Sequence, residues 1–222
     1  MLSEPEAWVL QEVCLPITER APVTDQLVQW RLLTELRQVD RYGGLGGLFL
    51  RTGVLWTLSP EWMLATQVAA IPNQVAPGQW EQEYRAEIEP NQMGRWGDWV
   101  WNDRHRLEWR HRIVAGEQIW HYRNQLRLMY APDGVDRMPF AWLEPIFDAD
   151  PTGFAAGHLG VAQVRSQAGI SRRLGKAGRL DFGLMVRSQF RQSNWAHDPV
   201  LNLALLYVPR GQPLGADGPA PS

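Results

Sequence analysis

The chain has 222 residues, of which 45% are apolar and 21% charged, so it is long enough for one barrel or sandwich and too apolar to be disordered over most of its length. Its formal net charge of −2 gives no basic footprint for a nucleic acid, and its single cysteine, Cys14, excludes an internal disulfide framework and a multi-cysteine metal site. Tryptophan is unusually frequent, with 12 residues, whereas Lys176 is the single lysine.

Apolar and polar residues alternate with a period of two in eleven segments separated by turn residues, and no segment has helical spacing of comparable strength. The spacing leaves no room for helical crossovers, so we expect an all-β, antiparallel up-and-down barrel. Single-chain bacterial barrels close with an even number of strands, so we expect ten or twelve. The predicted strands cover 8–18, 26–38, 46–58, 62–71, 79–89, 98–114, 118–131, 139–148, 159–175, 178–190 and 199–209.

Turn residues support this division. The sequence GKAGR at 175–179 predicts a three-residue hairpin loop with Gly178 in the left-handed conformation, a register that pairs Arg173 with Asp181 and Gln167 with Arg187. Residues 1–208 are expected to form a single barrel domain. The tail 209–222 is rich in Pro and Gly, and we expect it to be disordered.

Arginine and glutamate fill one face of the strongest strands, while Leu, Trp and Tyr fill the other. In 98–114, for example, Arg104, Arg106 and Glu108 alternate with Leu107 and Trp109. The charged residues predicted to share one face are Arg31, Glu35, Glu81, Glu83, Arg85, Glu87, Arg104, Arg106, Glu108, Arg110, Arg112, Arg123, Arg127, Glu144, Arg165, Asp181 and Arg187.

Two architectures fit this alternation. A soluble, lipocalin-like barrel that binds a small hydrophobic ligand would turn the apolar face inward, whereas an outer-membrane barrel turns it toward lipid and lines its lumen with the charges. Arg almost completely replaces Lys, which suits a confined interior because the guanidinium fork pairs with carboxylates. The polar face of 79–89 is mostly acidic and that of 98–114 mostly basic, so neighbouring strands complement each other.

Aromatic residues at the ends of the apolar faces also favour the membrane barrel. Trp and Tyr are typical of the girdles at lipid headgroup depth. The residues assigned to these girdles are Trp30, Trp56, Trp62, Trp80, Trp99, Trp101, Trp120, Tyr130, Trp142 and Tyr207. Against a clean lipid face, Asp103, His105, His111 and Asn124 lie on the apolar side of their strands.

The sequence predicts the bacterial outer membrane as the location and the lipid bilayer as the partner, with no nucleic acid and no clear protein partner. No run of about 18 apolar residues predicts a transmembrane helix. The beginning, MLSEPEAW, has no basic region followed by an apolar one, so for an exported protein we expect the leader to be missing from this sequence.

Several segments together resemble an uncharacterised family of small bacterial outer-membrane barrels, known only as a domain of unknown function. The resemblance rests on AWVLQEVCLPIT, on the turn TLSPEWML at 57–64, on the Glu- and Arg-rich middle from WEQEYRAEIE to WHYRNQLRLMY, on a strand with Glu144, and on HDPVLNLALLYV; it covers roughly 8–208. It implies the fold and the location but no activity. The sequence differs from the family's expected pattern at both ends, because it begins without a recognisable leader, which we expect to be missing from this sequence, and continues past Tyr207 into a tail.

No motif indicates a cofactor, and we expect no catalytic or metal site. His197, Asp198, Asp148 and Asp150 could supply a calcium site from two loops, although solvated carboxylates are the simpler interpretation. A lipid-modifying barrel enzyme would need a Ser and a His on the outer face, where His105 and His111 lie without a clear serine partner. We therefore expect a non-enzymatic barrel with a lumen largely filled by side chains.

Overall fold

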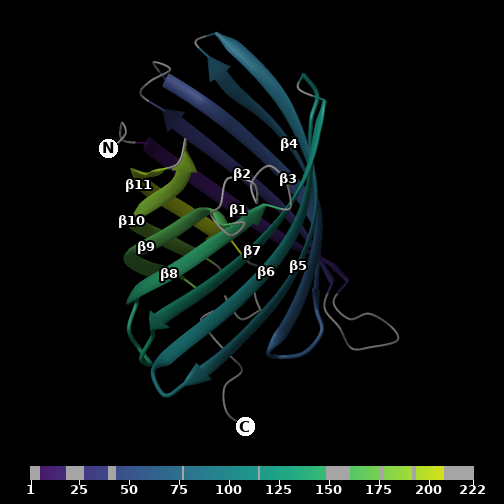
Figure 1. Ribbon diagram of the computed structural model, residues 1–222. Helices are drawn as coiled ribbons and strands as arrows, with labels where there is room; N and C mark the ends of the chain where they lie inside the picture. Colours follow the sequence, from purple (N-terminus) through teal and green to yellow (C-terminus); the bar gives the residue numbers. More distant parts are fainter. Residues whose placement is uncertain are drawn as a thin grey trace.

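The computed structural model describes residues 6–18, 28–39, 44–76, 78–114, 116–148, 161–175, 178–191 and 194–207. Its eleven strands form one closed barrel (Figure 1). They are β1 (Glu6–Thr18), β2 (Val28–Val39), β3 (Gly44–Thr57), β4 (Trp62–Ala76), β5 (Gln79–Trp96), β6 (Trp99–Arg112), β7 (Glu117–Tyr130), β8 (Arg137–Asp148), β9 (Val161–Leu174), β10 (Gly178–Arg191) and β11 (Asn194–Tyr207). None of the described residues forms a helix that could cross a membrane.

Each of the eleven predicted segments corresponds to a strand, so the all-β barrel is confirmed. The largest errors in strand length occur at prolines. The predictions for β4 and β5 stopped just before Pro72 and Pro90, and that for β11 began at Pro199, yet all three prolines pair inside a strand. Proline removes one ladder hydrogen bond, but long neighbouring strands still carry the sheet through these positions. The predicted tail 209–222 lies outside the described residues.

The expectation of an even strand number is wrong, because the barrel closes with eleven. Consecutive strands pair antiparallel, and β1 pairs with β11 in parallel, from Glu6 opposite Val200 to Val13 opposite Tyr207. In an up-and-down barrel an odd count makes the first and last strands run in the same direction. The first strand therefore starts at one end of the barrel and the last strand finishes at the other (Figure 1). We call the end where β1 begins the upper end and the end where β11 finishes the lower end.

The register predicted for the β9–β10 hairpin is also wrong. Arg173 pairs with Arg179 and Gln167 with Met185, whereas Asp181 pairs with Ser171. The glycine with positive φ is Gly175, at 68°, so the turn begins there and Gly178 already belongs to β10. Both glycines of GKAGR could supply the left-handed residue, and the choice between them shifts the register by two positions.

Charged side chains point into the barrel, beside a few buried apolar clusters, and the outer face of the strands is mainly apolar. Arg106 is 4% exposed, whereas the next residue on β6, Leu107, is 41% exposed. On β7, Arg123 is buried, whereas its neighbours in sequence, Tyr122 and Asn124, lie on the outer face. Leu126 and Leu128 are exposed on the same outer wall. A soluble lipocalin-like barrel would have the opposite polarity, because its apolar face would form the core.

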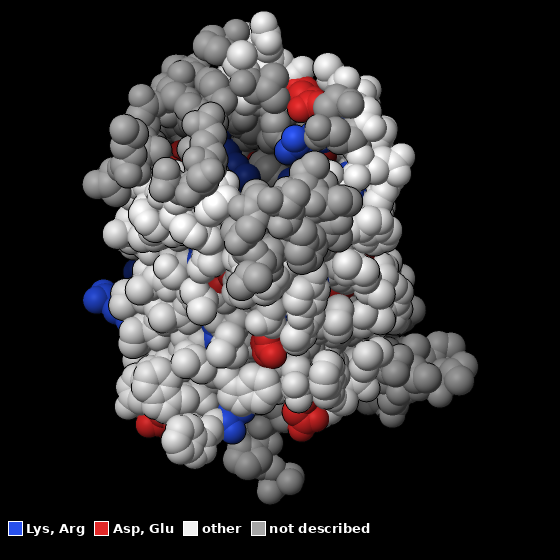
Figure 2. Space-filling view, viewed as in Figure 1, with Lys and Arg blue, Asp and Glu red and all other residues white. Residues whose placement is uncertain are grey.

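Aromatic residues gather near both ends of the outer wall. Trp62, Trp99 and Tyr130 stand at strand ends on the lower rim, while Trp80 lies close to the upper rim. Between the rims, most of the outer wall visible in Figure 2 is uncharged, and the charged side chains concentrate toward the two ends and in a hollow at the upper end.

The remaining residues assigned to the girdles differ in position. Trp30 and Trp120 are exposed on the wall, and Trp56 and Trp101 are half-buried. The assignment of Trp142 is wrong, because it packs inside the barrel against the buried clusters around Phe140 and Met185. It shares the inward face of β8 with Phe140 and Glu144, so its parity on the strand decides its position. The side chain of Tyr207 lies outside what the structure describes.

Candidate functional site

The pairing of β5 with β6 sets the arrangement of charges in the barrel. Glu83 lies opposite Arg112, but Arg85 lies opposite Arg110 and Glu87 opposite Glu108. The predicted complementarity therefore holds between directly opposite residues for Glu83 and Arg112 but fails at the next two positions. Ion pairs form instead along one strand or diagonally, as in Glu83 with Arg85 at 2.5 Å, because a long guanidinium reaches the neighbouring position.

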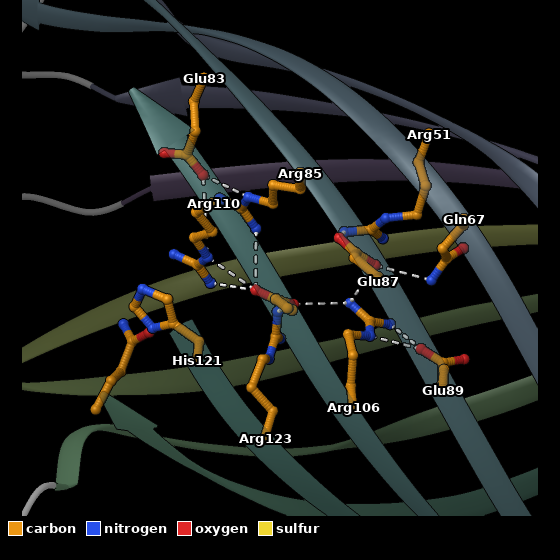
Figure 3. A network of polar contacts seen from close by, with 12 residues as sticks. Arg51, Gln67, Glu83, Arg85, Glu87, Glu89, Arg106, Arg110, His121 and Arg123 are labelled. Atoms are coloured by element: carbon orange, nitrogen blue, oxygen red, sulfur yellow. Dashed lines mark hydrogen bonds and ion pairs between the residues drawn. The ribbon is translucent and has the colours of Figure 1, made fainter. Parts of the chain in front are cut away.

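Glu108 is the centre of the largest group of ion pairs, here called the central network. It is 0% exposed and contacts four arginines: Arg123 at 2.8 Å, Arg106 at 3.4 Å, Arg85 at 3.6 Å, and Arg110. Figure 3 shows these four side chains converging from β5, β6 and β7. A carboxylate fully withdrawn from water needs such partners, since an unpaired buried charge is strongly destabilising.

Further contacts of the central network cross the lumen. Arg31 on β2 donates to Glu12 at 2.7 Å and to Glu89 at 2.8 Å, and Glu89 lies three strands away on β5. Glu89 also accepts from Arg106 Nε at 2.6 Å. The bridge from Arg31 to Glu89 joins non-adjacent strands, so it connects separate parts of the wall across the interior, whereas the other two contacts join neighbouring strands.

Glu87 and Glu144 extend the network on either side. Glu87 accepts from Arg51 at 3.0 Å and from Gln67 at 2.9 Å (Figure 3). Glu144 on β8 is shared by three arginines, which are Arg123 at 2.7 Å, Arg104 at 3.4 Å and Arg165 at 3.5 Å. Arg165 is held in addition by two hydrogen bonds to the Gln163 side chain.

A second group of charges lies near the lower end. Asp181 on β10 accepts from Arg127 Nη1 at 2.8 Å and from Ser171 Oγ at 2.6 Å, and Arg179 Nε lies 3.2 Å from it. Arg127 comes from β7, so this pair also spans non-adjacent strands. Two guanidinium groups share this one carboxylate.

A third group spans the parallel seam. Arg187 on β10 contacts Asp198 on β11 at 2.7 Å and Glu6 on β1 at 2.5 Å, and Glu6 also accepts from Trp8 Nε1. This arginine therefore connects three strands across the closure of the barrel.

The other residues of the predicted charged face lie toward the upper end. Glu35 pairs with Arg37 at 2.5 Å, apart from the central network. Glu81 is half-buried, and the side chain of Arg112 is 43% exposed and lies 3.6 Å from Glu83. The structure thus brings most of the predicted residues into these three groups, leaves Glu81 and Arg112 near the upper rim, and holds the buried Glu35 in a pair with Arg37.

Sequence reasoning left six charged residues of these groups out of the predicted charged face: Glu6, Glu12, Arg51, Glu89, Arg179 and Asp198. Glu89 had a signal, because it continues the alternation of Glu81, Glu83, Arg85 and Glu87 by one further step. Glu12 and Arg51 had no such signal in the sequence, because each is a single charge in an otherwise uncharged stretch of strand.

A cavity of about 280 Å³ lies beside the ion pairs. Its wall combines apolar side chains such as Phe140, Met129 and Leu206 with many charged ones, and it includes the buried thiol of Cys14. The arginines in the wall are Arg31, Arg37, Arg51, Arg85, Arg104, Arg106, Arg123, Arg127, Arg165 and Arg179. The carboxylates in the wall are Glu12, Glu35, Glu89, Glu144 and Asp181.

The residues considered for calcium do not come together. Asp148 lies 2.5 Å from His121, Asp198 is buried against Arg187, and His197 contacts Ser188 Oγ at 2.8 Å. Asp150 lies outside the described residues. Within the described part of the chain, no group of three or more His, Cys, Asp or Glu side chains could hold a metal ion.

The polar residues on the outer face of β6 and β7 form what we call the outer polar cluster: Asp103, His105, Tyr122 and Asn124. Tyr122 Oη lies 2.6 Å from His105 Nδ1, and Asp103 Oδ2 lies 3.3 Å from His105 Nε2. Asn124 donates to Asp103 Oδ1 at 2.6 Å. His111 lies apart and stacks on Trp109, so the two histidines of the outer face have different surroundings.

Replacement of Arg106 by leucine tests the central network. The Arg106→Leu variant leaves Glu87, Glu89 and Glu108 buried with one cation fewer, so we expect the free energy of unfolding to fall by about 3 kcal/mol. Urea unfolding of the refolded barrel measures this loss. In the control variant, Arg95→Leu, the ion-pair partner Asp133 is 96% exposed, and a loss of about 1 kcal/mol or less is expected. Equal losses of unfolding free energy in the two variants would mean that the interior charges are as well solvated as those at the rim.

Comparison with known proteins gives a family but no described activity. The sequence profile of the family described as "Protein of unknown function (DUF2490)" matches residues 6–198. No curated protein matches the chain. Among solved structures, LpxR from Salmonella typhimurium is similar, with a TM-score of 0.44 and 7% sequence identity over 84% of this chain and 83% of that chain. With the match extending over nearly all of the barrel, the chain belongs to the uncharacterised family DUF2490.

Proposed function

We propose that this protein is an integral β-barrel of the bacterial outer membrane, with a non-enzymatic role and an interior closed by ion pairs. The observation that carries the proposal is the inverted polarity of the wall. Leu107, Leu126 and Leu128 are each more than 40% exposed, while Arg106 and Glu108 beside them are buried. In water, this arrangement would expose apolar side chains on every strand, whereas in a bilayer those side chains contact hydrocarbon.

The dimensions and the hydrogen bonding support the same proposal. A tilted strand crosses the hydrocarbon core with about 9–11 residues, and the strands here have between 12 and 18. Closure through the parallel seam pairs β1 with β11 over eight residues, so the described strands form a closed sheet, as hydrocarbon requires. The tryptophans near both rims lie where lipid headgroups would meet the wall.

The interior supports a barrier more than a channel. Arg31 reaches Glu89 and Arg127 reaches Asp181, each across strands that lie between them in the wall. Such bridges cross the lumen and hold their side chains in place through charge-assisted hydrogen bonds. Opening a continuous water path would require several of them to separate.

Cell fractionation tests the location. The native protein is expected in the outer-membrane fraction, to remain there after a urea or alkaline wash, and to be extracted only by detergent. A peripheral outer-membrane protein, released by the same wash, serves as the control. Recovery of folded protein in the soluble fraction without detergent would contradict the proposal.

A second candidate function, hydrolysis of lipid esters at the outer wall, is favoured by the outer polar cluster. Ionisable side chains at membrane depth are costly, so their presence indicates a function. His105 would accept the proton of the Tyr122 hydroxyl as that oxygen attacks the ester carbonyl carbon, and would then pass the proton to the departing alcohol. Water would hydrolyse the acyl-tyrosine, and Asp103 would orient the imidazole throughout.

Release of fatty acid from phospholipid vesicles tests this second candidate. Activity should be present in the parent protein, fall at least about a hundredfold in His105→Ala and Tyr122→Phe, and persist in His111→Ala, whose imidazole stands apart from the cluster. Absence of fatty-acid release by the parent protein would exclude this function and leave the non-enzymatic proposal in place.

A further inference from the structure

The wall of the interior cavity contains more cations than anions. Its arginines outnumber its carboxylates, as the two groups of lining residues named above show. Part of this surplus is neutralised by glutamates behind the wall, including Glu87 and Glu108. The guanidinium groups nearest the lower end have no such additional carboxylate among the described residues. The excess of positive charge is therefore local to that end.

The imbalance is clearest around Asp181. This carboxylate accepts from Arg127 Nη1 and Ser171 Oγ, and both of its oxygens are therefore engaged. Among the described residues, the buried Nε and Nη2 of Arg127 have no hydrogen-bond partner, and the Nε of Arg179 lies 3.2 Å from Asp181 without forming a hydrogen bond to it. Two guanidinium groups thus share one carboxylate and retain buried N–H donors, which is unfavourable unless an acceptor satisfies them.

An apolar surface adjoins these donors. The Arg127 guanidinium stacks on the ring of Phe140 at 4.1 Å, and Phe140 belongs to a buried cluster with Val100 and Met129. Trp142 packs against the same cluster and, like these residues, lines the cavity. An apolar pocket with a few convergent polar groups is the usual form of a small-molecule site.

From this juxtaposition we propose that the cavity binds a small organic anion, with its carboxylate or phosphate group at Arg127 and Arg179 and its apolar body against Phe140 and Met129. Arginine suits this role because its N–H groups match the two oxygens of a carboxylate or phosphate. The anion would balance the local excess of positive charge and accept hydrogen bonds from the N–H groups of Arg127. This inference concerns the interior alone and does not depend on the membrane in which the barrel resides.

Binding of benzoate to the full chain in detergent tests the proposal. Benzoate is expected to bind at a single site and to raise the unfolding temperature, whereas benzamide, of the same shape but uncharged, should do neither. The Arg127→Gln and Arg179→Gln variants should each weaken benzoate binding about tenfold or more, as expected when a hydrogen bond to a charged group is lost. Arg137→Gln, at an exposed position at the start of β8, is the matched control and should bind as the parent does.

Two outcomes would overturn the proposal or part of it, and one further variant separates charge from packing. Folding of each variant is verified by circular dichroism. Equal binding of benzoate by the parent and both glutamine variants would show that the anion does not bind at these arginines. Tight binding of inorganic phosphate without binding of benzoate would assign a simple oxyanion site and exclude the apolar body. If Arg127→Lys restores binding that Arg127→Gln loses, the cation itself, and not only packing, is required.

Discussion

The structure depends on the mutual neutralisation of charges that have been withdrawn from water. Once the outer wall is apolar, every polar side chain that faces inward must find its partner among the others. Glu108 illustrates the solution, because it is fully buried and four guanidinium groups surround it. Removing one member of such a group leaves a buried charge with fewer partners, which costs several kcal/mol. The charges therefore constrain the register and the closure of the barrel as well as its interior.

Closure with eleven strands places a special demand on one seam. Parallel pairing of β1 with β11 is slightly less stable per residue than antiparallel pairing. On the inner side of this seam, Arg187 connects Glu6 of β1 with Asp198 of β11. An ion pair thus supports the junction where the backbone ladder is weakest, and both carboxylates are almost completely buried there.

The alternation of residue types was sufficient to predict the strands, the closed sheet and the inward direction of Arg106 and Arg123, because parity along a strand assigns each side chain to a face. The alternation did not determine the register of the strands. Gly175 and Gly178 are equivalent as sequence signals, and only the backbone shows that Gly175 has positive φ. For the same reason, the sequence did not reveal that Arg85 lies opposite Arg110. The cavity depends on contacts across the lumen, such as Arg127 with Asp181, and no local pattern encodes such contacts.

Spin labels on adjacent residues of β7 test the central claim, the outward direction of the apolar face, most directly. Leu126 is exposed on the outer wall, whereas Gln125 lines the interior cavity. Each is replaced by a labelled cysteine in a Cys14→Ser background, and the barrel is placed in a bilayer. The label at 126 should collide frequently with oxygen dissolved in the hydrocarbon and rarely with a water-soluble nickel chelate, and the label at 125 should be shielded from oxygen. A label at 126 that is more accessible to the chelate than to oxygen, or equal behaviour at both positions, would contradict the claim.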